Sequence, residues 1–463
     1  MSKESLIAIF DVGKTNKKLF LFDDHYQIAY EQSQTFEEIK DEDGFPTENI
    51  DALSRWICEK FREVSSHKNH KISAVNFSAY GASMIHLGNN GKPITPLYNY
   101  LKPFPEKLKN KFYDAYGGET LLAKQTASPV LGSLNSGLQL YRLKYEQPKV
   151  YEQIKYTLHL PQYLSFLICS TTASEITSIG CHTHLWDFEK HHYHEWVYKE
   201  EIDKKFSSIY PSDKVVGNTK DNLKIPVGIG LHDSSAALIP YLAAFSETFV
   251  LISTGTWCIS LNPFNQTPIT EDELQNDCLC YLTYHGKPVK ASRLFAGYEH
   301  EQQVKRLGEH FDTANDFYKT VKYNSRFLKN LETEFSSKNT GNQTAMIQQS
   351  AFSKRDLNDF ENYEEAYHQL INDLIHQQVE STKIVLHDAP VKKIFVDGGF
   401  SKNEIYMNLL ANAFPEMEVY AASIPQASAL GAALAIHSYW NKNQLPGNLI
   451  NLKFFHSSNH QLK

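Results

Sequence analysis

The sequence has few cysteines and no long hydrophobic segment. Its 463 residues include six cysteines, with no Cys-x-x-Cys pair and no spacing typical of a disulfide framework. No apolar run approaches the roughly 18 residues that a helix needs to span a bilayer. A strand-like pattern begins within the first residues and leaves no room for a signal peptide. We therefore expect a cytoplasmic protein that does not associate with a membrane.

An excess of basic residues is also absent. Lys and Arg number 46 against 53 Asp and Glu, and the basic residues are scattered along the chain. Because nucleic-acid binding depends on cations that neutralise phosphates, this balance argues against a nucleic-acid partner. The chain is too long for one ordinary core, which predicts two or three domains. A small-molecule ligand fits this composition, and a homodimer is left open.

Two common phosphate-binding signatures are missing as well. The chain has no G-x-G-x-x-G fingerprint after a strand and no G-x-x-x-x-G-K-[ST] loop. The first absence disfavours a dinucleotide-dependent dehydrogenase. A phosphate site in this chain has to come from other turns.

Two β-hairpins with polar turns are predicted far apart in the chain. The first joins apolar runs at 6–10 and 19–22, and the second joins apolar runs at 249–253 and 257–261. A repeated hairpin of this kind indicates two similar domains that face one cleft.

Helical and strand-like segments alternate around these hairpins. Helical periodicity at 51–65 and 234–244, with a buried strand at 72–78, favours the α/β class. We place the domain boundary at 244/245, which gives an N-terminal domain at 1–244 and a C-terminal domain at 245–463.

The turns of both hairpins offer donors for phosphate. Asp11 ends the first strand, where its carboxylate can meet a metal ion, and a polar turn follows it. The second turn is uncharged but also rich in donors. The candidate nucleotide ligands on the two turns are Gly13, Lys14, Thr15, Asn16, Lys17, Thr254, Gly255 and Thr256. An ordinary polar turn is the alternative in each case.

A third segment joins a strand at 392–396 to Gly398, Gly399 and a helix. Bare backbone at such a junction can receive a ribose or adenine, and the amides at a helix N-terminus favour anions. A Ser-x-x-Glu capping box at Ser401 predicts that the helix begins there. The small residues at 427–435 predict a last helix that packs very close to a neighbour.

Asp233 lies where a short strand meets a helix. An aspartate at such a junction can simply cap the helix. It can also accept the proton of a hydroxyl that attacks phosphorus, with His232 as a neighbouring sugar contact. The residues alone leave both interpretations open.

Four motifs give the chain its resemblance to a known family. DVGKTNKK, GLHDSSAA, ISTGTW and FVDGGFSKN, the last followed by ASALGAALA, occur in the order used by FGGY carbohydrate kinases and span nearly the whole chain. The His-Asp pair and the Thr-Gly-Thr-Trp turn most resemble the L-rhamnulokinase and L-fuculokinase branch, which phosphorylates ketoses.

The resemblance implies two RNase H-like domains of the actin/hexokinase type, an interdomain cleft, and catalysis with ATP and Mg²⁺. Residues 1–244 would then form the sugar-binding and catalytic-base domain, and 245–463 the nucleotide-binding domain. Asp11 would serve the metal, and Asp233 would be the catalytic base. The residues that would face the nucleotide after the last sheet strand are Gly398, Gly399, Phe400 and Asn403.

The sugar site departs most from the family pattern. Members commonly carry an aromatic residue, an Asp and an Arg after a Gly-x-Pro stretch, whereas residues 98–102 here read YNYLK. Lys14 also replaces a Thr of the family's first turn, a change that still suits phosphate. The expected sugar contacts are Tyr80, Gly81, Asn99 and His232.

A kinase that converts a ketose such as L-rhamnulose or L-fuculose to its 1-phosphate is the leading hypothesis. One alternative is a kinase of another pentulose, an aldose or a polyol. The other is an actin-like ATP-binding protein without sugar kinase activity.

Five histidines crowd residues 182–194. His182 and His184 could share one face of a strand and bind a metal. The alternative that we favour is a polar hairpin and a solvated loop.

Overall fold

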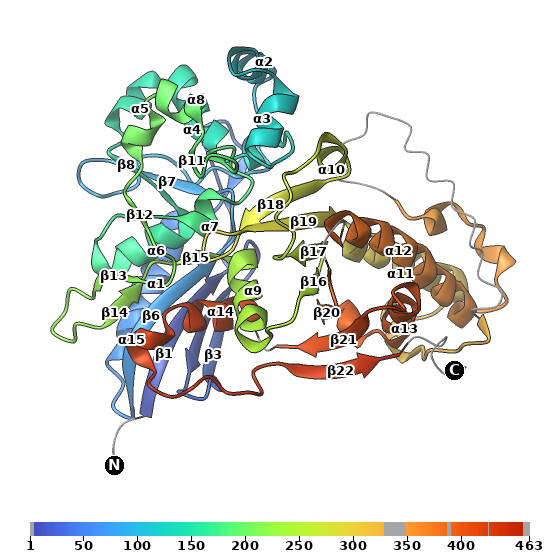
Figure 1. Ribbon diagram of the computed structural model, residues 1–463. Helices are drawn as coiled ribbons and strands as arrows, with labels where there is room; N and C mark the ends of the chain where they lie inside the picture. Colours follow the sequence, from blue (N-terminus) through green and yellow to red (C-terminus); the bar gives the residue numbers. More distant parts are fainter. Residues whose placement is uncertain (1–3, 328–348, 387–389, 425, 457–463) are drawn as a thin grey trace.

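The computed structural model describes residues 4–327, 349–386, 390–424 and 426–456. They form two mixed β-sheets, each with helices packed against it (Figure 1). The prediction of two α/β domains is confirmed. Within these residues no helix is both long enough and apolar enough to cross a membrane.

The N-terminal sheet contains the first predicted hairpin. Its strand order is β13-β14-β6-β1-β2-β3, and β15 also pairs with β6. β1 is antiparallel to β2 and parallel to β6. The strand bounds are β1 Glu4–Val12, β2 Lys17–Phe22, β3 Ile28–Gln34, β6 His70–Ala79, β13 Val215–Asn218, β14 Pro226–Gly228 and β15 Leu231–His232.

The C-terminal sheet contains the second predicted hairpin. Its strand order is β18-β19-β17-β16-β20-β21-β22. β16 is antiparallel to β17 and parallel to β20, which repeats the pattern around β1. The strand bounds are β16 Phe249–Thr254, β17 Cys258–Asn262, β18 Cys278–Leu282, β19 Pro288–Leu294, β20 Lys393–Gly398, β21 Glu418–Ser423 and β22 Asn451–Phe455.

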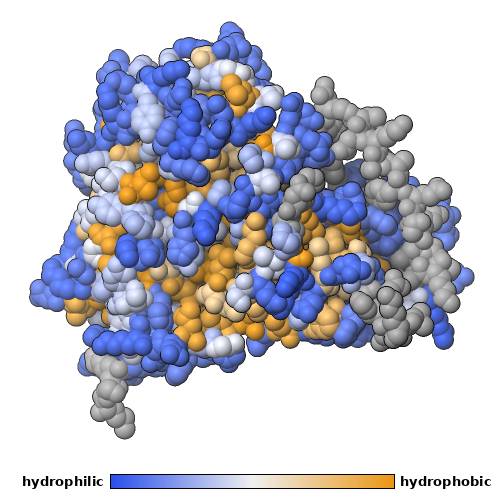
Figure 2. All heavy atoms as spheres, viewed as in Figure 1, coloured by the Kyte–Doolittle hydropathy of each residue, from blue (hydrophilic) through white to orange (hydrophobic). Residues whose placement is uncertain are grey.

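Two helices, α9 (Asp233–Ala244) and α14 (Ala427–Ala435), pack against each other at the junction of the two sheets. Ala236 of α9 joins the core of the N-terminal sheet, and Tyr241 joins the core of the C-terminal sheet. A Cβ on Gly431 of α14 would lie 1.8 Å from the backbone oxygen of Ala236, so the predicted close packing is confirmed. Figure 2 shows apolar residues gathered across the middle of this face, where α9 and α14 run in Figure 1. α9 thus links the two halves of the molecule.

The other helices cover the outer faces of the sheets or belong to an insertion after β6. α1 (Ile50–Ser65) and α6 (Leu160–Cys169) pack on the N-terminal sheet. α11 (Ala296–Phe311), α12 (Tyr363–Leu386) and α13 (Glu404–Ala413) pack on the C-terminal sheet. The remaining elements are β4 Ile39–Lys40, β5 Pro46–Thr47, β7 Met84–Leu87, α2 Glu106–Ala115, α3 Glu119–Gln125, α4 Gly137–Glu146, α5 Pro148–Gln153, β8 Tyr156–His159, β9 Ser174–Glu175, α7 Ile176–Ile179, β10 Trp186–Asp187, β11 His192–Tyr193, α8 Glu195–Lys199, β12 Ile209–Tyr210, α10 Glu271–Gln275 and α15 His437–Trp440.

The crowded histidines divide between a buried pair, His182 and His184, and a hairpin whose turn at 189–191 is exposed. His182 and His184 are buried, and both ring nitrogens of His184 contact hydroxyls, those of Thr126 (2.7 Å) and Tyr113 (3.2 Å). Burial lowers the pKa of His182 and of His184 to about 3, so both rings are neutral. In the part of the chain that the structure describes, no three potential ligands converge as a metal site. The predicted hairpin is present as β10 and β11.

Candidate active site

Asp233 is the first residue of α9, and its side chain does not cap the helix. His232 occupies the N-cap position, and Asp233 Oδ1 accepts the backbone N–H of the adjacent Ser234 (2.6 Å). Burial raises the pKa of Asp233 to about 6 and outweighs the hydrogen bonds from Ser234. Oδ2 has no hydrogen-bond partner among the described residues. A carboxylate with one oxygen available and a pKa of about 6 suits a general base.

His232 lies beside this carboxylate as a neutral ring. Its Nε2 is 3.2 Å from Asp233 Oδ1 and 3.0 Å from Cys181 Sγ. Burial lowers the pKa of His232 to about 3, so the imidazole carries no charge at neutral pH. A Cβ on Gly81 would lie 3.1 Å from the ring, so the end of the expected sugar strand touches the His-Asp pair. The structure brings together Gly81, His232 and Asp233.

Asp11 ends β1 near the same carboxylate. The register of the first hairpin places Lys18 directly opposite Asp11. Ser428 of α14 donates a hydrogen bond to Asp11 Oδ2 (2.8 Å). Burial, with a contribution from the negative charge of Asp233, raises the pKa of Asp11 to about 6. The charge of Asp233 adds to the cost of ionising Asp11, and a divalent cation beside Asp11 would offset this cost.

The first turn is held by a buried ion pair. Lys17 Nζ lies 2.8 Å from Glu48 Oε1 and donates to the backbone oxygen of Lys14 (2.9 Å). Both charged side chains are buried, at 2% and 4% exposed. Lys17 is expected among the phosphate ligands, but its side chain points into the protein. It stabilises the turn from its buried side through Glu48 and the backbone oxygen of Lys14.

The tip of the first turn is open to solvent. Gly13 N–H donates to the backbone oxygen of Asn16 (2.9 Å) and closes the turn. Thr15 and Asn16 are exposed, and Lys14 pairs with Glu38 near the surface (2.9 Å). Backbone and side-chain donors at 14–16 are therefore the part of this turn that a phosphate could reach.

The second turn and the Gly-Gly junction form one unit. The Thr254 hydroxyl donates to the backbone oxygen of Asp397 and accepts the N–H of Phe400 (3.0 Å). A Cβ on Gly398 would lie 1.8 Å from the backbone oxygen of Thr254. Thr254 thus fixes the junction, and the residues that remain exposed on this unit are Gly255, Thr256, Gly398 and Gly399.

Phe400 and Asn403 support this junction from within the protein. The Phe400 ring is buried and stacks on Tyr406, with ring centroids 4.6 Å apart. Asn403 Oδ1 accepts two backbone N–H groups of α13, which begins at Glu404. The predicted capping box at Ser401 is wrong, because Asn403 is the residue that caps the helix.

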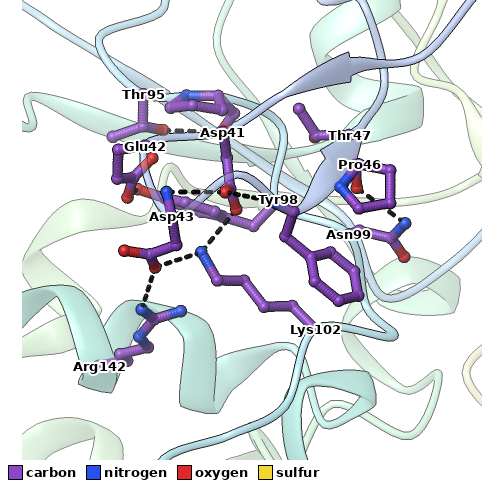
Figure 3. Close-up of polar contacts among 12 residues, drawn as sticks. Asp41, Glu42, Asp43, Pro46, Thr47, Thr95, Tyr98, Asn99, Lys102 and Arg142 are labelled. Carbon is purple, nitrogen blue, oxygen red and sulfur yellow. Dashed lines mark hydrogen bonds and ion pairs between the residues drawn. The ribbon is translucent and has the colours of Figure 1, made fainter.

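The loop that carries Asn99 is held by ion pairs of the buried Lys102 with the buried Asp41 and the exposed Asp43 (Figure 3). Lys102 Nζ lies 2.5 Å from Asp41 Oδ2 and 2.6 Å from Asp43 Oδ2. Asn99 Nδ2 donates to the backbone oxygen of Pro46 (3.0 Å). The amide of Asn99, expected at the sugar, is engaged within the loop.

Four residues at these sites escaped the sequence analysis. Lys18 could have been predicted from the sequence, because the register of a hairpin identifies the residue opposite Asp11. Ser428 and Glu48 are distant in the sequence from the groups they bind, and no local pattern marks them. Gly297 is a similar case: a Cβ there would lie 1.8 Å from the backbone oxygen of Gly255, which lets α11 start against the second turn.

Helix α9 connects the acidic groups to the nucleotide side of the site. Asp233 begins this helix, and Tyr241, about two turns later, donates to Asp397 Oδ2 (3.2 Å) beside the Gly-Gly junction. A base, a second carboxylate for a metal and donor-rich turns are the parts that phosphoryl-transfer enzymes require. The fold and the site define a two-domain phosphotransferase.

The sequence identifies the family. Residues 6–240 match the N-terminal domain of the FGGY family of carbohydrate kinases, and residues 246–444 match the carbohydrate kinase FGGY C-terminal domain. The chain belongs to the FGGY family of carbohydrate kinases. It is an enzyme that uses ATP to phosphorylate a hydroxyl of a small sugar.

Curated relatives and solved structures extend this comparison. The chain is 23% identical to a rhamnulokinase of Oceanobacillus iheyensis over 413 residues, which cover 83% of this chain and 82% of the relative. A carbohydrate kinase from Novosphingobium aromaticivorans superposes with a TM-score of 0.79 at 21% identity, covering 99% of this chain and 95% of that one. Glycerol kinase of Plasmodium falciparum with ADP gives a TM-score of 0.74 at 15% identity and the same coverages.

Proposed function

We propose that the enzyme phosphorylates a ketose at its C1 hydroxyl, with L-rhamnulose or L-fuculose as the leading substrates. The relatives named rhamnulokinase support this class. Similar structures named xylulose kinase, gluconate kinase and glycerol kinase make another pentulose, an aldonate or aldose, or a polyol the competing acceptors. The observation that carries the proposal is the environment of Asp233, a buried carboxylate beside a neutral histidine with one oxygen left for a substrate hydroxyl.

In the proposed reaction the sugar hydroxyl lies against Asp233 Oδ2. The hydroxyl oxygen attacks the γ-phosphorus of ATP, the bond from that phosphorus to the bridging oxygen breaks, and ADP leaves. The proton of the hydroxyl passes to the carboxylate. Gly81 packs closely against Cys181 and His232. The uncharged His232 ring would orient a hydroxyl without competing for the proton.

Asp11 is the group that fits a magnesium ion. Mg²⁺ is commonly held by one or two carboxylates together with substrate phosphates, and it neutralises charge on the transferring group. Ser428 occupies one oxygen of Asp11, and the other oxygen remains for the metal or its water. We expect Asp11→Ala to raise the Mg²⁺ concentration needed for half-maximal turnover at least tenfold. An unchanged magnesium dependence would contradict this role.

We assign the nucleotide to the exposed backbone of the three turns. Residues 14–16 and 255–256 would receive the phosphates, and Gly398 with Gly399 would lie against the nucleoside. The sugar, the base and the phosphate contacts of the first turn then belong to residues 1–244, and the rest of the nucleotide site belongs to 245–463. We also propose a cytoplasmic location, where ATP is supplied. Sedimentation of the purified chain would decide between a monomer and a homodimer.

An ADP-release assay with Asp233→Asn tests the base directly. The acceptors are L-rhamnulose, L-fuculose, L-ribulose, D-xylulose and glycerol. We expect the variant to lose turnover by about 10³-fold, within the range for removal of a general base, while the Kd for ATP changes less than about twofold. Asp213→Asn, at a carboxylate that is 40% exposed, is the matched control.

Two results would count against the proposal. Near-normal turnover in Asp233→Asn would reject the base. ADP release at background with every acceptor would favour the actin-like ATP-binding alternative over a ketose kinase.

A further inference from the structure

Tyr100 lies beside Tyr80, one of the expected sugar contacts. Its half-buried ring stands edge-on to Tyr80, with centroids 6.3 Å apart. Tyr80 directly precedes Gly81, which touches the His232 ring beside Asp233. Burial and then the charge of Asp233 raise the pKa of Tyr100, so its hydroxyl lies within the field of the base. Tyr100 therefore lies on the same side of the site as Tyr80, within the electrostatic influence of Asp233.

Tyr100 differs from its aromatic neighbours in what its hydroxyl does. Tyr80 donates to Glu48 Oε2 (3.2 Å), and Tyr98 donates to Glu42 Oε1 (2.6 Å). The Tyr100 hydroxyl has no hydrogen bond to another residue that the structure describes. Of the three tyrosines, Tyr100 is the one whose polar end is available to a ligand.

The backbone around Tyr100 is fixed in place. Lys102 N–H donates to the backbone oxygen of Asn99 (2.9 Å), which makes Tyr100 the second residue of a tight turn. The Lys102 side chain is clamped between Asp41 and Asp43, as Figure 3 shows. A side chain presented from an anchored turn loses little conformational freedom when it binds a ligand.

We propose that Tyr100 contacts the sugar and determines which ketose is accepted. This inference rests on the proposed sugar kinase function. Its ring would cover a C–H face of the ketose beyond the reacting C1 hydroxyl, and its hydroxyl would bind one of the sugar hydroxyls. Aromatic rings suit the apolar faces of sugars, while a correctly placed polar group discriminates among stereoisomers because a mismatched partner stays unpaired.

A matched pair of substitutions in this loop tests the inference. In Tyr100→Phe the ring remains and the hydroxyl is lost. We expect the KM for the preferred ketose to rise about tenfold, the order for one buried hydrogen bond, with the KM for ATP and the thermal unfolding midpoint unchanged. Tyr98→Phe removes a hydroxyl that serves only the loop, so it should lower the unfolding midpoint and leave both KM values as in the wild type.

Tyr100→Ala adds the loss of the ring. We expect about 100-fold lower kcat/KM for the preferred ketose, and a smaller preference for it over the second-best ketose of the panel. If both Tyr100 variants keep the wild-type KM for sugar and the wild-type preference, the inference is rejected although the enzyme is a ketose kinase. If the wild type releases no ADP with any sugar, the proposed function itself fails. The two failures are therefore distinguishable.

Discussion

The two hairpins occupy equivalent places in the two sheets, yet different interactions shape their turns. Each first strand, β1 or β16, has an antiparallel partner on one side and a parallel strand on the other. Behind the first turn lies the buried pair of Lys17 and Glu48. The second turn is shaped by glycines that let backbone segments approach closely, as at Gly297 and Gly398. The buried Arg293–Asp277 pair lies next to it, with the guanidinium 5.6 Å from the centroid of the Trp257 ring.

This difference decides how each turn tolerates change. A buried ion pair is costly to break, but the two charges can be removed together. A backbone contact that excludes a Cβ has no such compensation, because every residue except glycine carries that atom. The first turn should therefore be sensitive to charge, and the second to side-chain volume.

The largest effect should come from Gly398→Ala in the second turn. Gly398 has φ +82°, and its new Cβ would overlap the backbone oxygen of Thr254. We expect the free energy of unfolding to fall by more than about 4 kcal/mol, as for the most damaging single substitutions. Urea unfolding of this variant and of Gly399→Ala measures the effect.

Gly399→Ala is the control on the neighbouring residue. Gly399 has φ −64°, and a Cβ there would meet nothing within 4 Å. Its stability should stay within about 1 kcal/mol of the wild type. Equal stability of the two variants would refute the claim that close backbone contact holds the second turn. A weaker Kd for ATP in Gly399→Ala would instead support the nucleotide assignment.

Lys17→Met should have the next largest effect, on the first turn. The substitution leaves the buried carboxylate of Glu48 without its cation and should cost about 3 kcal/mol of stability. Lys14→Met breaks a more exposed pair with Glu38 and should cost less than about 1 kcal/mol. Adding Glu48→Gln to Lys17→Met should restore part of the loss. If Lys17→Met and Lys14→Met proved equally stable in urea, the first turn would not depend on its buried pair.

The same contrast explains what the sequence could predict. Both hairpins, the helix at 234–244 and the small-residue helix at 427–435 follow from local periodicity, and the structure has them within a few residues. Asp11, Asp233 and Gly398 mark strand ends, where side chains and bare backbone gather in α/β folds. Features that depend on one strand or turn could therefore be predicted from the sequence.

Features that depend on partners far apart in the sequence could not be predicted from it. Lys17 reads like a phosphate ligand until Glu48 is known to lie behind it. Asn403 and Ser401 are equally good caps by composition, and the choice depends on how the Gly-Gly junction enters α13. Tyr100 lies in the stretch 98–102 that departs from the family's sugar-site pattern, and the sequence does not distinguish it from Tyr98. The anchored turn and the neighbouring Tyr80 do so in the structure.

The remaining prediction concerns how activity and stability depend on pH through Asp11 and Asp233. The smallest effect within it is that of Lys18, which lies opposite Asp11 in the first hairpin. The pKa values of Asp11 and Asp233 are both about 6, so kcat/KM should fall as the pH drops through about 6 and the two carboxylates become protonated. The free energy of unfolding should change with pH in the opposite direction to kcat/KM. The folded state holds these protons more tightly than the unfolded chain, whose Asp groups titrate near 3.8, so the free energy of unfolding should decrease between about pH 4 and 6 as pH rises.

Lys18 affects the acidic limb of the pH profile of kcat/KM because its positive charge lowers the pKa of Asp11. Lys18→Met should therefore shift the acidic limb of kcat/KM to higher pH, by roughly half a unit or less since this residue is partly exposed. Lys18→Arg keeps the charge and should keep the wild-type profile. A limb that moved to lower pH in Lys18→Met, or moved equally in both variants, would show that the charge opposite Asp11 does not set its ionisation. An uncharged second turn offers no equivalent residue, so only the first hairpin should give the enzyme this dependence.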